Sequence, residues 1–276
     1  DSDYLKVKRK ESIWRNSASY AVKDNFNVGL GLNYTFASEV KEKDVGTAPL
    51  NYEEYSEKGL QNILLNGSYR LMDQTGGQLN LDILATLSIK PGTSEYGYAA
   101  DASTSSNGNA IDPHHSLEVG ARIGKKVSSQ FEWIAGLFAE YNFKGKAEGK
   151  IDNGSGLEDE DTDYDAHLVT SLLGAVQFRP VEPLMLQFSL NVSRASKYSY
   201  EQESSAGKTK ITLDPVTTSE IGALARYAVR PNVIINLGGS YSQAQDFDYE
   251  IKDSGVNSEV KDAKSVKFVA GADFLF

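Results

Sequence analysis

Residues 78–90 read QLNLDILATLSIK, and the alternation in this stretch decides the fold. Its odd positions form a wholly apolar face, made of Leu79, Leu81, Ile83, Ala85, Leu87 and Ile89. Its even positions form a mostly polar face, made of Asn80, Asp82, Leu84, Thr86, Ser88 and Lys90. A period of two predicts a β-strand whose two faces meet different environments.

The same alternation recurs along the chain. It is clear in residues 26–36, 131–144 and 266–276, and noisier in residues 12–22, 59–72, 116–126, 165–179, 184–200, 216–229 and 233–247. Strands of soluble proteins cluster at about 5–6 residues, whereas a tilted strand needs roughly 9–11 residues to cross a bilayer. The lengths of these segments therefore favour strands that span a membrane.

The connections between the segments alternate in length. Short ones lie near residues 23–25, 73–77, 127–130, 180–183 and 230–232, and long polar ones near residues 41–58, 91–115, 145–163, 201–215 and 248–263. Short periplasmic turns and long extracellular loops are typical of outer-membrane barrels. Hydrocarbon offers no partner to backbone N–H and C=O groups, so a spanning sheet must close. We expect an all-β chain with one domain, residues 1–276, forming a closed antiparallel transmembrane β-barrel in the bacterial outer membrane.

Parity sets the expected number of strands. Five short turns give ten strands, and the segment that ends at Phe276 is the eleventh. Single-chain bacterial barrels have even counts. We therefore expect about twelve strands, the twelfth being a short basic strand within residues 1–11, where Leu5 and Val7 alternate with lysines.

Composition excludes several classes of protein. The net charge of −10 argues against a nucleic-acid partner. The chain has no cysteine, which removes disulfides and thiolate chemistry. A mean hydropathy of −0.40 and the lack of a long apolar run exclude a transmembrane helix. No signal peptide pattern opens the chain, so we expect any export signal to have been removed.

Aromatic residues fall into two bands, as expected for interfacial girdles. One band lies on the short-turn side and comprises Tyr20, Phe26, Tyr69, Phe131, Phe178, Tyr227, Phe274 and Phe276. The other lies on the long-loop side and comprises Tyr34, Phe36, Tyr141, Phe143, Tyr198, Tyr200 and Tyr241. Phe276 also resembles the terminal signal that hands outer-membrane proteins to the insertion machinery.

Residues 58–145 carry a family resemblance. The stretches GLQNILLNGSYRLMDQTGGQLNLDILATLSIKPGTSEYG and DPHHSLEVGARIGKKVSSQFEWIAGLFAEYNF contain a strand ending in Tyr-Arg-Leu, a Gly-Gly turn, a strand running into Lys-Pro-Gly and a strand ending in Gly-Lys-Lys. They resemble the outer-membrane channels associated with the phenol meta-degradation pathway and the related channel that exports functional amyloid. This resemblance implies a twelve-stranded channel, and a homotrimer is one assembly that it allows. It identifies no substrate.

The polar phase of the strands supplies candidate pore-lining residues. They are Lys6, Lys8, Lys10, Arg15, Arg70, Asp82, Lys90, Glu118, Arg122, Glu132, Glu140, His167, Arg179, Glu220, Arg226, Lys267 and Asp273. We expect ion pairs across neighbouring strands, for example Glu118 or Glu132 with Arg122. The resulting prediction is a porin-like channel for passive passage of small hydrophilic or amphipathic solutes. The alternative is a structural or surface-interaction barrel with a closed lumen.

The sequence gives little support for a catalytic site or a metal site. The acidic residues 157–165 lack the ligand spacing of a calcium loop, so we expect neither a metal site nor a cofactor. His114, His115 and His167 are the histidines from which a hydrolase would have to be built, and no G-x-S-x-G motif is present. An outer-membrane enzyme is the less favoured alternative. The expected partners are outer-membrane lipid, lipopolysaccharide and small solutes.

Overall fold

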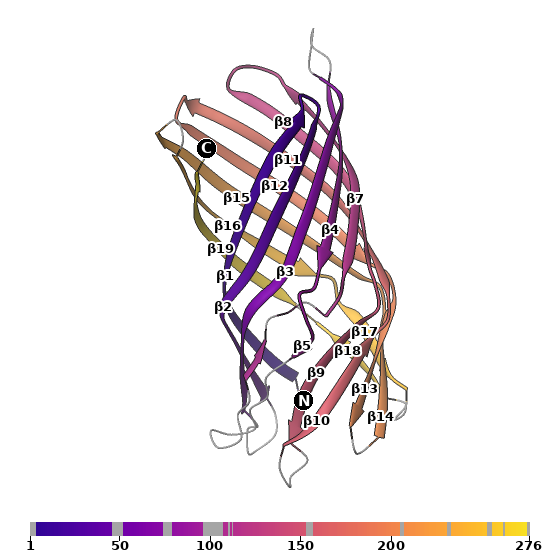
Figure 1. Cartoon of the computed structure of the whole chain (residues 1–276). Coiled ribbons are helices and arrows are strands. Elements are labelled where there is room, and N and C mark those ends of the chain that lie inside the picture. The colour runs from indigo at the N-terminus through magenta and orange to yellow at the C-terminus, as the bar shows by residue number, and fades with distance from the viewer. Residues whose placement is uncertain are drawn as a thin grey trace.

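The computed structural model describes residues 4–45, 52–73, 79–95, 107–109, 111, 113–152, 157–204, 207–230, 233–252, 256–261 and 263–274. All of its regular elements are β-strands, and they form two sheets that are antiparallel except for the pairs β3–β6 and β5–β9 (Figure 1). The described residues contain no helix long and apolar enough to cross a membrane.

The larger sheet, called the wall here, is a curled sheet of eleven strands in sequence order. These are β1 (Tyr4–Lys23), β2 (Phe26–Val45), β3 (Tyr52–Met72), β4 (Asn80–Ile89), β7 (Ser116–Lys126), β8 (Phe131–Asn142), β11 (His167–Val181), β12 (Leu184–Ala195), β15 (Val216–Arg230), β16 (Val233–Ala244) and β19 (Lys264–Phe274). The short β6 (Asn107–Asn109) pairs with β3 in parallel. Short turns join neighbouring strands at the end drawn uppermost in Figure 1.

The second sheet stands at the opposite end of the wall (Figure 1). Its strands are β5 (Ser94–Glu95), β9 (Gly145–Asp152), β10 (Leu157–Tyr164), β13 (Tyr198–Ser204), β14 (Gly207–Leu213), β17 (Phe247–Ile251) and β18 (Val256–Val260). The described parts of three segments expected to be long loops, residues 145–163, 201–215 and 248–263, therefore consist mainly of strands. Backbone pairing across the hairpins holds these polar segments in strands, and composition alone does not reveal that pairing.

The expected closure and strand number need correction. Residues 4–11 are not a separate strand, because they continue β1 and pair with β2, Tyr4 lying opposite Val45. In the hydrogen-bonded order β1 and β19 are the two ends, and within the described residues they do not pair with each other. The structure thus shows a curled sheet of eleven strands where we expected a closed barrel of about twelve.

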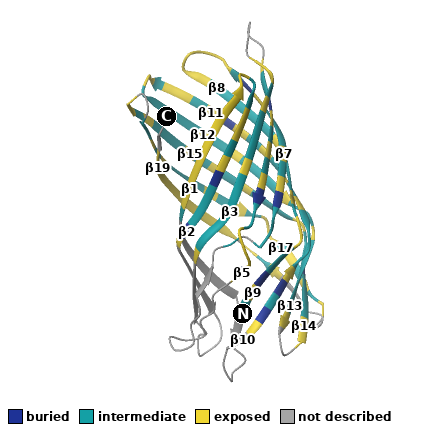
Figure 2. Ribbon diagram, in the orientation of Figure 1, coloured by how far each residue is buried: buried dark blue, intermediate teal, exposed yellow. Residues whose placement is uncertain are grey.

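The apolar phase of the wall lies on its outer face, as the sequence predicts. Leu137 is 58% exposed and Phe268 is 88% exposed, whereas Asp82 on the polar phase is 6% exposed. Exposed and less exposed residues alternate along the wall strands (Figure 2). The concave face consequently gathers the polar side chains.

The two sheets share one register across a line that we call the bend. In β8 and β11 Asn142 lies opposite His167, and in β9 and β10 Gly145 lies opposite Tyr164. Two residues per strand separate these pairs. Two residues also separate the paired strands of the next hairpins, so the bend passes through residues 143–144, 165–166, 196–197, 214–215 and 245–246. Between β18 and β19 it passes between Val260 and Lys264. The second sheet is therefore a continuation of the wall strands.

The side chains that face inward change phase at the bend. His167 belongs to the less exposed phase of β11, and its ring stacks on Tyr198 with centroids 4.5 Å apart. The ring of His114 lies 5.3 Å from both His167 and Tyr164. Tyr164 and Tyr198 are therefore on the same side as His167, although strict alternation along β10 and β11 would separate Tyr164 from His167.

This phase change reverses the polarity of the two faces. In the second sheet the inward phase carries Tyr164, Tyr200, Ile211, Tyr249 and Ile251, and the opposite phase carries lysines and carboxylates. Thr162, Ala147 and Glu160, on the inward phase, are 2%, 3% and 8% exposed. The wall thus presents apolar side chains outward, and the second sheet presents charged side chains outward.

Candidate functional site: a charged groove beside the bend

The outward face of the second sheet is a lattice of lysines and carboxylates. Lys146, Asp163, Glu201 and Lys210 lie opposite one another on four successive strands. Lys146 contacts Asp161 at 2.8 Å, and Lys208 contacts Glu203 at 2.7 Å and Glu201 at 3.3 Å. These hydrogen-bonded carboxylates raise the pKa of Lys146 and of Lys208. Their side chains remain about half exposed, so the lattice contributes little to stability.

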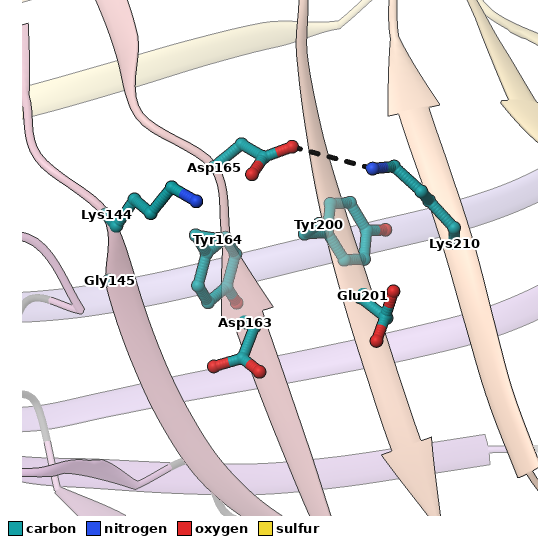
Figure 3. Close-up of a pocket in the computed structure, with 8 residues that line it drawn as sticks. All are labelled: Lys144, Gly145, Asp163, Tyr164, Asp165, Tyr200, Glu201 and Lys210. Atoms are coloured by element: carbon teal, nitrogen blue, oxygen red, sulfur yellow. Dashed lines mark ion pairs between the residues drawn. The ribbon is translucent and has the colours of Figure 1, made fainter.

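A pocket of about 340 Å³ opens between β9, β10, β13 and β14 (Figure 3). Lys144 and Asp165 lie toward one end, and Asp163 and Glu201 toward the other. Lys210 forms an ion pair with Asp165 at 3.7 Å. Tyr164 and Tyr200 complete the lining. Burial raises the pKa of the Tyr200 phenol, so it stays a neutral hydrogen-bonding group at physiological pH.

A second pocket, of about 420 Å³, adjoins the first and shares Lys144, Asp165 and Lys210 with it. Its lining adds Lys197 and Lys252. We call the two pockets together the charged groove. All four lysines come from residues at the bend or from the second sheet, so the shared register of the two sheets brings them together.

Sequence reasoning missed Lys210 and Lys252 because their segments were expected to be solvated loops, whereas Lys144 and Lys197 lie in expected strand segments and were not singled out. A signal was present in residues 207–213, GKTKITL, where Lys208 and Lys210 alternate with Gly207, Thr209 and Ile211. Such alternation predicts a strand with one charged face. What the segment itself does not show is which neighbouring strands bring Lys144 and Lys252 beside Lys210.

Of the predicted pore residues, Arg70, Asp82 and Arg122 come together on the concave face. Arg70 Nε and Arg122 Nη2 each lie 2.8 Å from a carboxylate oxygen of Asp82. The predicted pairing of Arg122 with Glu118 or Glu132 is therefore wrong. Asp82 lies directly opposite Arg122 on the neighbouring β4, whereas Glu118 lies on the same strand as Arg122.

Other predicted pore residues form separate contacts on the concave face. Glu220 and Lys267 form an ion pair at 3.8 Å, and Arg226 Nε donates to Asn236 Oδ1 at 3.0 Å. Glu118 and Glu140 lie opposite each other on β7 and β8. These contacts do not join into one site.

The remaining predicted residues lie elsewhere on the wall. Glu132 and Arg179 line a small pocket at the short-turn end, and Arg15 is exposed on β1 opposite Asn33. The backbone N–H of Lys90 donates to His115 Nδ1 at 3.2 Å. The side chains of Lys6, Lys8, Lys10 and Asp273 lie outside the described residues, as does Phe276.

The histidines gather at the bend, on the concave side. His114 Nδ1 lies 2.7 Å from the carbonyl oxygen of Phe143, and His167 stacks on Tyr198. The predicted girdle position of Tyr198 and Tyr200 is therefore wrong, because both belong to the inward phase of the second sheet. Within the described residues no group of three or more histidine, aspartate or glutamate side chains could hold a metal ion.

The concave face of the wall is occupied by side chains that cover one another. The ring of Phe138 lies across Gly136, where an added Cβ would meet its Cε2 at 2.6 Å. Leu224 covers Gly238 in the same way, with Cδ1 at 3.0 Å from such a Cβ. Glycine at these positions makes room for a large neighbouring side chain, Phe138 or Leu224, on the concave face.

No protein-family model matches this chain, and no curated protein matches it in sequence. A solved structure that it resembles is the crystal structure of the outer membrane protease OmpT from Escherichia coli, at 11% identity and a TM-score of 0.39. The alignment covers 99% of this chain and 96% of that one. This likeness assigns no activity to the chain. The protein of that structure is named a protease, and the porin-like channel expected from the sequence is withdrawn.

Proposed function

We propose that this chain is an outer-membrane β-barrel protein with a structural and surface-interaction role and a closed lumen. The wall lies in the hydrocarbon, and the second sheet stands in the water outside it, where the charged groove receives a polar partner. The short turns face the periplasm.

The observation that carries the proposal is the reversal of polarity at the bend. A β-sheet in water buries its apolar face and exposes its charges, whereas a membrane sheet does the reverse. Leu137 and Phe268 are exposed on the outer face of the wall, whereas Lys208 and Glu203 are exposed on that of the second sheet. The outer surface of one continuous set of strands therefore suits hydrocarbon on the wall and water on the second sheet, with the boundary between them at the bend.

The alternative of a sheet with its apolar face packed against another protein predicts a different environment for the same residues. Site-directed spin labels distinguish the two, and the chain has no cysteine to remove first. Leu137→Cys and Phe268→Cys place labels on the wall. Glu203→Cys and Lys208→Cys place labels on the second sheet and serve as matched controls.

In phosphatidylcholine vesicles, labels at the two wall positions should be broadened by oxygen, which partitions into hydrocarbon, more than by a water-soluble nickel complex. Labels at the two second-sheet positions should show the opposite order. Equal accessibility to both reagents at all four positions would refute the proposal. For the closed lumen, the expected result in planar bilayers is no steady current.

A further inference from the structure

The larger pocket of the charged groove has an unusual balance of charge for this protein. Four lysines line it, Lys144, Lys197, Lys210 and Lys252, and Asp165 is the carboxylate of its lining. The chain as a whole carries a net charge of −10. A pocket with an excess of cations in an acidic chain indicates a site for an anion.

Two of the four lysines have their charge balanced within the sheet. Lys197 Nζ lies 2.8 Å from Asp214, a hydrogen bond that raises the pKa of Lys197. Lys210 pairs with Asp165 at 3.7 Å. In contrast, Lys144 and Lys252 make no ion pair with any residue that the structure describes. The surplus positive charge of the pocket therefore resides on these two side chains.

Hydroxyl groups line the pocket beside the lysines. Ser199 Oγ and Thr212 Oγ1 lie 2.9 Å apart on neighbouring strands, and Thr212 is 6% exposed. Ammonium groups and hydroxyls are the donors that proteins direct at the oxygens of phosphate. Lys144, Lys210 and Lys252 come from three separate parts of the chain and line the same pocket, as a tetrahedral anion with several oxygens requires.

The position of the pocket at the bend indicates which molecule carries the phosphate that it binds. Lys144 and Lys197 are bend residues, and Lys144 directly follows Phe143, an apolar bend residue that is 40% exposed. On the proposed function the bend is the boundary between hydrocarbon and water, which is the level of lipid headgroups.

We infer that the pocket of Lys144, Lys197, Lys210 and Lys252 binds the phosphate of a membrane glycolipid or phospholipid headgroup at the bend. The inference rests on the proposed function for the source of the phosphate. The chemistry of the site, ammonium and hydroxyl donors that line one pocket, does not depend on that source.

The test uses the folded chain in uncharged detergent micelles and, separately, in nanodiscs of phosphatidylcholine with and without phosphatidic acid, whose headgroup is a phosphate monoester. Inorganic phosphate is titrated into the micellar protein and followed by calorimetry, and lipid contacts are followed by ³¹P NMR. The test variant is Lys144→Gln/Lys252→Gln. The matched control is Lys208→Gln/Lys261→Gln. Lys208 lies in β14 and Lys261 directly follows β18; both are exposed, lie outside the pocket lining and already pair with glutamates.

The expected result is that the test variant binds phosphate about tenfold more weakly while the control is unchanged. Binding of inorganic phosphate in micelles together with phosphatidic acid in nanodiscs supports the site. Binding of phosphatidic acid alone also supports the site and assigns it to lipid. Phosphate binding that the test variant leaves unchanged, equal weakening in the test and control variants, or no binding to either probe overturns the inference. The micelle titration contains no phospholipid. Phosphate binding in micelles would therefore support the site even if the spin-label experiment refuted the membrane placement of the wall.

Discussion

Asp82 joins Arg70 and Arg122 across three strands of the wall. Arg70 on β3 and Arg122 on β7 each place a guanidinium nitrogen 2.8 Å from the carboxylate, whose side chain is 8% exposed. The cluster ties β4 to both of its neighbours near the short-turn end of the wall. One carboxylate thus balances two cations whose own side chains are about 40% exposed.

The first prediction concerns this cluster. Asp82→Asn should lower the free energy of unfolding by about 2–4 kcal/mol, because two guanidinium groups would then face each other with no counter-charge. Asp73→Asn is the control, since Asp73 is 66% exposed and contacts Arg70 at 3.4 Å. Asp73→Asn should lower the free energy of unfolding by less than about 0.5 kcal/mol. Urea unfolding in detergent micelles measures both, and similar losses in the two variants would contradict the role given to Asp82.

A second prediction tests the outer face of the wall. Leu137→Lys should destabilise the protein folded in phospholipid vesicles by about 2–4 kcal/mol, because the ammonium would lie in hydrocarbon. Gln245→Lys, at an exposed position of the bend, should change stability by about 0–1 kcal/mol, since it lies near the water boundary. Reversible urea unfolding from vesicles compares the two, and a harmless Leu137→Lys would argue that this face meets water.

The third prediction concerns the packing of Phe138 against Gly136. Gly136→Ala should cost about 1–3 kcal/mol, because the new methyl group would overlap the Phe138 ring. Gly174→Ala, where nothing lies within 4 Å of the added Cβ, should be nearly neutral. In a Phe138→Ala background the cost of Gly136→Ala should largely disappear. A double-mutant cycle measures this coupling, and additive costs would show that the two residues do not compete for space.

A fourth prediction follows from the tyrosines of the second sheet. Burial raises the pKa of Tyr198 and is the main reason that the pKa of Tyr200 is raised. The native state therefore holds these protons more tightly than the unfolded chain, so their contribution is full below the unfolded value near 10 and is lost as pH rises above it. Unfolding midpoints measured between about pH 9 and pH 11.5 should fall with pH.

Removing the phenol groups should remove that dependence. Tyr198→Phe/Tyr200→Phe keeps the rings and should flatten the decline of the midpoint. Tyr20→Phe is the matched control, because Tyr20 is 72% exposed on the wall. A decline that is as steep in the double variant as in the parent chain would contradict the assignment.

Much of the wall was predictable from the sequence. Strand β7 begins and ends where the alternation places it, at Ser116 and Lys126, and β4 differs from residues 78–90 by one or two residues at its ends. The inward position of Asp82 and Arg70 also follows from the phase of their strands. These features are local, since side-chain direction in a strand depends on sequence parity alone.

The partners of those residues were less predictable. Arg122 was expected to pair with Glu118 or Glu132, and it pairs with Asp82 on β4. Parity says which face a side chain is on and leaves open which residue of the next strand lies opposite. That choice depends on the register, which the turns and the whole sheet set together.

The sequence by itself determined a chain of antiparallel strands with an apolar and a polar face, because a period of two leaves no other regular structure. The tertiary structure decided where that pattern reverses. The segments 145–163 and 201–215 look like solvated loops on their own, and only pairing in register with neighbouring strands makes β9, β10, β13 and β14 part of a sheet. At the bend two residues per strand shift the phase, so the lysines turn outward and the tyrosines inward. This shift is a cooperative property of several adjacent strands, and no single strand encodes it.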